Sequence, residues 1–79
     1  MDSVIAGRLT RTFKFVFDDP NLELERSTTA KEVEGWDSLT HINLIVAIER
    51  EFRIRFTTAE ISALNNVGDL TDLIARKLS

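Results

Sequence analysis

The stretch EGWDSLTHINLI, residues 34–45, holds the side chains best suited to chemistry. Ser38 carries a hydroxyl, and Asp37 precedes it. A serine nucleophile needs an adjacent base that a third group orients. His41 lies three residues further on in the same predicted helix, and nothing else in the sequence would orient it. We therefore expect Ser38 to be modified by another enzyme, and we expect no enzymatic activity from this chain.

Ser38 stands where a predicted helix begins, and a serine there is most often the N-cap. Asp37 is an equally good N-cap one residue earlier. If Asp37 caps the helix, the Ser38 hydroxyl is left free in the first turn. A phosphate ester on it would then lie near unpaired N–H groups and the positive end of the helix dipole. The sequence leaves both arrangements open.

The spacing of apolar residues predicts an all-α fold, a small four-helix bundle with three main helices and a short third one. The predicted helices cover residues 3–17, 38–52, about 58–63 and 69–78. Thr57 and Glu60 have the form of a capping box before the third helix. Asp69 is the expected N-cap of the fourth.

The link between the first two predicted helices, residues 18–37, is longer than most helix-to-helix connections, and long ordered loops are often functional. Leu22 and Leu24 are expected to pin it to the core. Gly35 is expected to adopt a backbone conformation, or a close approach, that a side chain would block. A lone tryptophan in a loop is more often a core plug than a partner contact, and this is our interpretation of Trp36.

The second predicted helix has two apolar faces. One arc contains the expected core residues Leu44, Ile45, Ile48 and Phe52. A separate strip contains Leu39, Ile42 and Val46. The strip either packs against the loop or another helix, or it forms a docking surface for a partner.

The composition indicates one ordinary globular domain, residues 1–79, with 43% hydrophobic and 29% charged residues. There is no cysteine and only one histidine, so we expect no metal site. No apolar run approaches the roughly 20 residues of a membrane span. Met1-Asp2-Ser3 lacks the basic start of a signal peptide, which predicts the cytoplasm and no membrane.

The charge is unevenly spread. The net charge is -3, but residues 18–37 hold seven acidic and two basic residues. An acidic loop argues against nucleic acid as a partner. Arg50, Arg53 and Arg55 are expected to be a solvated helix end.

Gly35-Trp36-Asp37-Ser38-Leu39, the long loop before it and Ile42-Asn43-Leu44-Ile45 after it resemble the phosphopantetheine-attachment site of acyl carrier proteins. Chain length, helix order, the capped third helix and Val67-Gly68-Asp69-Leu70 extend the resemblance over nearly the whole chain.

The resemblance implies that Ser38 receives 4'-phosphopantetheine from coenzyme A through a separate phosphopantetheinyl transferase with magnesium, and that Asp37 contacts that transferase. The terminal thiol of the arm would carry acyl groups as thioesters. The carrier would be a monomer, and its partners would be enzymes of the ligase, ketosynthase or acyltransferase type. Partner enzymes would bind the second helix through Leu39, Ile42 and Val46. The residues implied to shelter the cargo or the arm are Leu44, Ile48, Phe52, Ile54 and Ile61.

Two departures from that pattern concern partners and packing. The second helix of fatty-acid-synthesis carriers is strongly acidic, whereas this chain has Thr40 and Asn43, and Arg50 separates its two acids. This favours a dedicated route, such as polyketide or hybrid peptide synthesis. Glu34 also stands where a leucine is common, which affects how the loop packs. The alternatives are an aminoacyl or peptidyl carrier, which Trp36-Asp37 fits less well, and an unmodified helical adaptor.

Overall fold

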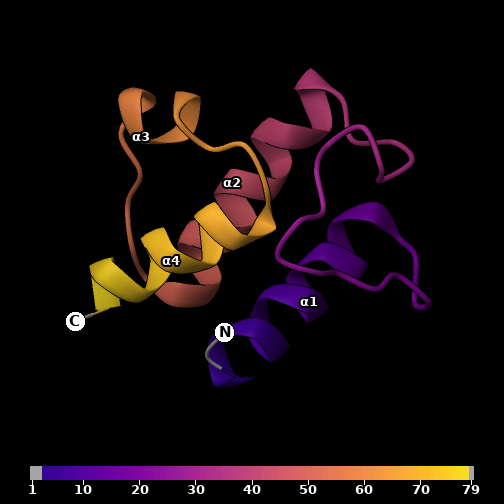
Figure 1. Cartoon of the computed structure of the whole chain (residues 1–79), viewed down its shortest axis with the longest axis horizontal. Helices are drawn as coiled ribbons and strands as arrows, with labels where there is room; N and C mark the ends of the chain where they lie inside the picture. The colour runs from indigo at the N-terminus through magenta and orange to yellow at the C-terminus, as the bar shows by residue number, and fades with distance from the viewer. Residues whose placement is uncertain (1–2, 79) are drawn as a thin grey trace.

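The computed structural model describes residues 3–78, which form four α-helices (Figure 1). These are α1 (Ser3–Phe17), α2 (Ser38–Phe52), α3 (Thr58–Ser62) and α4 (Val67–Leu78). The predicted all-α architecture with a short third helix is confirmed. Met1 and Asp2, on which part of the signal-peptide argument depends, lie outside the described residues, as does Ser79. Within residues 3–78, no helix has the length and apolar character that crossing a bilayer needs.

The core forms where α1 packs on α2 and α4. From α1, side chains at every fourth position point inward, because positions four apart share one helix face. The buried residues of the whole core, from α1, α2 and α4, are Ile5, Leu9, Phe13, Leu44, Ile48, Phe52, Val67, Leu70 and Ile74. In Figure 1, α3 and its flanking segments lie across α2 and α4 from α1.

Local hydrogen bonds end α2 and begin α3. Arg53 adopts the left-handed conformation at φ 55°, and its N–H bonds the carbonyl of Glu49. The predicted capping box of α3 is confirmed: Thr57 Oγ1 accepts from the Glu60 N–H at 3.1 Å, and Glu60 Oε1 accepts from the Thr57 N–H at 2.8 Å. Lys77 also holds the Glu60 carboxylate at 2.9 Å and lowers its pKa.

The predicted start of α4 is wrong by two residues. The helix begins at Val67, and Asn66 Oδ1 accepts the Asp69 N–H at 2.8 Å. Asp69 therefore lies in the first turn and turns back to accept the Asn65 N–H at 3.2 Å. Asn caps a helix as well as Asp does, and the earlier start buries Val67 in the core.

The long loop is held at its middle by the start of α4. The N–H groups of Val67 and Gly68 donate to the carbonyls of Thr28 and Arg26, at 2.9 and 2.8 Å. The Arg26 guanidinium also donates to both carboxylate oxygens of Asp72, at 3.0 and 2.8 Å, which lowers the Asp72 pKa. As expected, Leu22 and Leu24 are partly buried against the core. The loop is thus fixed between α1 and the start of α2.

Gly68 offers a test of this attachment. A Cβ there would lie 3.0 Å from the Arg26 carbonyl oxygen, whereas one on the exposed Gly7 of α1 would meet nothing within 4 Å. We predict that Gly68→Ala lowers the free energy of unfolding by about 1 kcal/mol through overpacking. Gly7→Ala, the control, should raise it by about 0.5–1 kcal/mol, because alanine is the better helix former. Urea denaturation measures both, and equal stabilisation by the two variants would contradict the close attachment.

Candidate functional site

The start of α2 is capped by Asp37. Its backbone is extended, and its Oδ1 accepts the Thr40 N–H at 2.9 Å. The Asp37 carbonyl accepts the His41 N–H at 2.8 Å, which is the first hydrogen bond of the helix. Of the two arrangements that the sequence leaves open, the structure has Asp37 as N-cap and Ser38 as the first helical residue.

The Asp37 carboxylate is stabilised as an anion by this position. The Thr40 N–H is the main cause that lowers the Asp37 pKa, since a hydrogen bond to the charged form favours that form. The side chain is therefore ionised at neutral pH, and it is committed to the cap.

Ser38 is exposed and opens onto a hollow of about 470 Å³. The hollow is lined by Ala30, Trp36, Asp37, Ser38 and His41. The first turn of α2 contains no acidic residue, and the helix dipole is positive here. The site can therefore accept a phosphodiester on the Ser38 oxygen.

Trp36 is a core plug, as expected, and it has a partner that the sequence did not indicate. Its ring meets Phe13 edge-on at 5.3 Å between centroids and Phe17 at 5.9 Å. Its Nε1–H donates to His41 Nδ1 at 3.0 Å. His41 is thus tied to Trp36, and a hydrogen bond at its Nδ1 leaves that nitrogen unable to act as a base toward Ser38.

The turn before the cap directs Trp36 inward. Gly35 has φ 86°, a conformation that strains residues with a Cβ and confirms the expectation for this glycine. The Trp36 N–H bonds the carbonyl of Val33, which is buried, while the adjacent Glu34 is exposed. The acid at position 34 therefore faces water, and the loop is packed through Val33.

The two apolar faces of α2 are separated as expected. Leu39, Ile42 and Val46 are 71%, 61% and 42% exposed. Leu44, Ile48 and Phe52 are buried, Ile54 packs partly buried against the core, and Ile61 is partly buried outside the core cluster. The strip is therefore a surface rather than a contact with the loop.

A small cavity of about 80 Å³ adjoins the Ser38 hollow. The two share Ala30, Trp36 and His41. The cavity is also lined by Leu64, Asn65, Asn66 and Leu70. Residues 3–78 contain no group of three or more His, Asp or Glu side chains that could hold a metal ion.

Comparison with known proteins identifies the family. The family model described as "Phosphopantetheine attachment site" matches residues 7–74. The chain belongs to this family. Its fold also matches the solution structure of a holo acyl carrier protein from Geobacter metallireducens, with a TM-score of 0.89 and 46% sequence identity over 94% of this chain and 85% of that one. No curated protein matches the sequence.

The chain is thus an acyl carrier protein, a carrier rather than an enzyme, and its group is a covalently attached phosphopantetheine. Membership of the family implies that a phosphopantetheinyl transferase and acyl-handling enzymes are its partners.

The cap of this acyl carrier protein gives a pH-dependent prediction. Because the folded pKa of Asp37 is lowered, its contribution to stability is present above the unfolded value of about 3.9 and is lost as pH falls through the folded value. We expect Asp37→Ala to lower the urea midpoint at pH 7. Asp37→Asn should keep most of the cap, because asparagine also accepts the Thr40 N–H.

Measuring unfolding from pH 7 to pH 3 checks this. The pKa values of Asp72 and Glu60 are also lowered, so their contributions to stability are likewise lost as pH falls. The informative quantity is therefore the free energy of unfolding of the wild type minus that of Asp37→Asn. That difference should shrink below pH 4. An acid dependence unchanged by Asp37→Asn would contradict the assignment.

Proposed function

We propose that Ser38 carries the phosphopantetheine arm of this acyl carrier protein. The observation that carries the proposal is the cap: Asp37 takes the Thr40 N–H, and the exposed Ser38 hydroxyl is left available beside a hollow. The positive end of α2 favours the phosphodiester there.

The transfer step needs little from this chain. The Ser38 oxygen attacks the phosphorus of coenzyme A that bears pantetheine, the pyrophosphate P–O bond breaks, and adenosine 3',5'-bisphosphate leaves. The serine proton passes to a base on the transferase, because His41 Nδ1 is occupied by Trp36. Asp37 is proposed to contact the transferase. The arm, when bound, supplies a thiol that carries acyl groups as thioesters.

We propose that the arm lies over Trp36 and His41 on its way from Ser38. Support comes from the hollow and the adjoining cavity, both of which are lined by Trp36 and His41. The proposed shelter formed by Leu44, Ile48, Phe52, Ile54 and Ile61 requires more. Leu44 and Ile48 have no exposed surface, so cargo would enter only if the helices separate.

Modification of Ser38 is tested by intact mass. We expect coenzyme A and a broad-specificity phosphopantetheinyl transferase to add one phosphopantetheinyl group to the wild type and none to Ser38→Ala. Ser62→Ala, which removes another exposed serine, is the control and should be modified fully. A wild type that stays unmodified, while a known carrier is converted, would favour an unmodified helical adaptor.

We propose that Leu39, Ile42 and Val46 form the docking strip for the acyl-handling enzymes. Their exposure on one face of α2, beginning beside Ser38, supports this role. The carrier is further proposed to act as a monomeric single domain, and its cytoplasmic location stays a prediction.

We propose that the cargo belongs to a dedicated pathway, such as polyketide or hybrid peptide synthesis. From Ser38 to Ile48, α2 contains no acidic residue. Enzymes that recognise carriers through arginines would find little to steer them here. This supports a dedicated set of enzymes rather than those of general fatty acid synthesis.

Restoring the missing acids tests that proposal. We predict that Thr40→Glu combined with Asn43→Glu raises kcat/KM for malonyl transfer by a fatty-acid-synthesis transacylase by about tenfold at low salt, through steering. Ser27→Glu with Ser62→Glu makes the same charge change outside α2 and should have little effect. The gain should fade at high salt. A wild type as efficient as an acidic fatty-acid carrier would contradict a dedicated pathway.

A further inference from the structure

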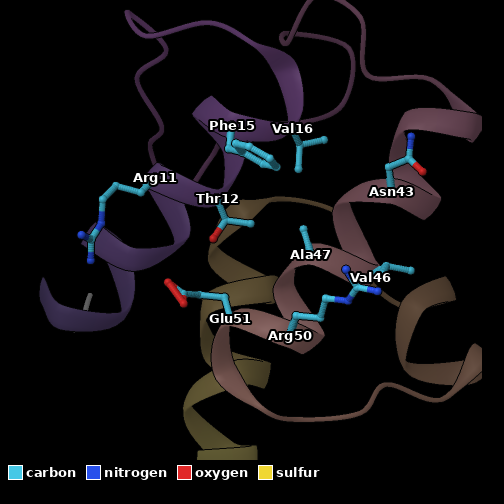
Figure 2. A pocket seen from close by; sticks show the side chains of 9 residues that line it. All are labelled: Arg11, Thr12, Phe15, Val16, Asn43, Val46, Ala47, Arg50 and Glu51. Atoms are coloured by element: carbon cyan, nitrogen blue, oxygen red, sulfur yellow. The ribbon is translucent and has the colours of Figure 1, made fainter.

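A second surface lies between α1 and α2, beside the docking strip (Figure 2). It is an open groove of about 700 Å³. Figure 2 shows Arg11, Phe15 and Val16 on the α1 side, and Val46, Ala47 and Arg50 on the α2 side. The groove shares only Val46 with the strip, and Ser38 does not line it.

The α1 wall exposes an aromatic side chain. Phe15 is 84% exposed although it lies in the helix that supplies much of the core. It stands beside Val16, and it lines the same groove as Val46, which is itself 42% exposed. Apolar groups that stay in water within one groove mark a surface that a partner covers.

The surroundings of the groove are basic. Arg11 and Arg50 line it, and Arg50 with Arg53 and Arg55 also lines an adjoining hollow of about 520 Å³. All four arginines are exposed, and none forms an ion pair with the residues from 3 to 78.

The nearby acidic groups are already engaged. Arg8 pairs with the Glu51 carboxylate at 3.5 Å and lies over the Phe52 ring. Glu49 Oε2 accepts the Phe56 N–H at 2.9 Å. Glu51 also lines the groove, and Glu49 lines the hollow. Glu51 is paired with Arg8, so the carboxylate of Glu49 is set against four unpaired arginines. The net charge of this surface is therefore positive.

We propose that this groove binds an acidic amphipathic helix of a partner protein. Its apolar side covers Phe15 and Val46, and its carboxylates pair with the arginines, whose planar guanidinium groups suit bidentate bonds to carboxylates. From Asn43 to Arg53 the groove and hollow span about 15 Å of α2, which is about three turns of a bound helix. The inference deepens the proposed docking role and rests on the carrier function for its biological meaning.

Other occupants fit less well. The acidic segment of a second copy, residues 18–37, is not helical, and its Leu22 and Leu24 are packed in its own core. Nucleic acid would bring phosphates but no apolar side chains for Phe15, and it would be repelled by that same acidic loop. A bilayer surface is flat, whereas these apolar groups line a groove.

The test is an NMR titration of the ¹⁵N-labelled full chain, unmodified and again after phosphopantetheinylation. The probe is a peptide of about 14 residues, long enough for a helix of about 20 Å. It has leucines along one face and glutamates elsewhere, and a matched peptide has lysines for glutamates. We expect the acidic peptide to shift the amide signals of Phe15, Val46, Ala47 and Arg50.

The variants separate charge from apolar contact. Phe15→Ala, Arg50→Glu and Arg11→Glu should each weaken binding by about tenfold, and circular dichroism checks that each is folded. Lys31→Glu, an exposed loop position, makes the same charge change as the arginine variants and should leave the affinity unchanged.

The proposal is overturned if no saturable binding occurs, if the lysine peptide binds equally well, or if the shifts lie elsewhere. It is also overturned if anionic vesicles or a DNA duplex compete more strongly at the same salt, or if the same signals report self-association. Binding by the unmodified chain does not depend on Ser38, so a carrier that cannot be modified yet binds the peptide would refute only the proposed function.

Discussion

The hydrogen bond from the Thr40 N–H to the Asp37 carboxylate decides what Ser38 can do. A helix start has several backbone donors without partners, and a capping side chain supplies an oxygen for one of them. If Ser38 supplied that oxygen, its hydroxyl would be turned onto its own backbone and committed. Because Asp37 supplies it, the hydroxyl remains outside the helix while still lying at its positive end. The cap is thus supplied by Asp37, and the proposed attachment falls to the adjacent Ser38, which has different chemistry.

That arrangement depends on a loop fixed at several points. Its middle is bound to α4 through the carbonyls of Arg26 and Thr28, and through the Arg26–Asp72 pair. The exposed ion pair contributes little by itself. The two backbone bonds and the close approach of Gly68 set the position. At the far end of the loop, Gly35 turns the chain so that Trp36 packs on Phe13. This contact fixes the residue before the cap relative to the core face of α1.

The sequence predicted most of this where the signals are local. Apolar spacing and capping residues fixed the bounds of α1, α2 and nearly α3, because those interactions join residues three or four apart. The start of α4 was missed because Asn66 and Asp69 are both good caps, and the choice depends on burial of Val67 against α1 and α2. The Trp36–His41 bond was missed because it joins a loop residue to a helix residue, and their contact depends on the Gly35 turn. The sequence left Asp37 and Ser38 undecided for a similar reason, since either side chain satisfies the local pattern.

The role of the arginines at the end of α2 also depends on contacts that the sequence does not predict. In sequence, Arg50 looks like a solvated charge, and it is indeed exposed. Only the packing of α1 on α2 brings Phe15 near it and makes one surface of both. The acidic loop precedes Ser38, whereas the basic groups follow Val46, so the two ends of α2 have opposite charge. A partner that binds along α2 therefore meets negative charge at one end and positive charge at the other. Binding in the reverse direction would set the partner's acidic groups against the acidic loop, so the order of charges favours one direction of binding along α2.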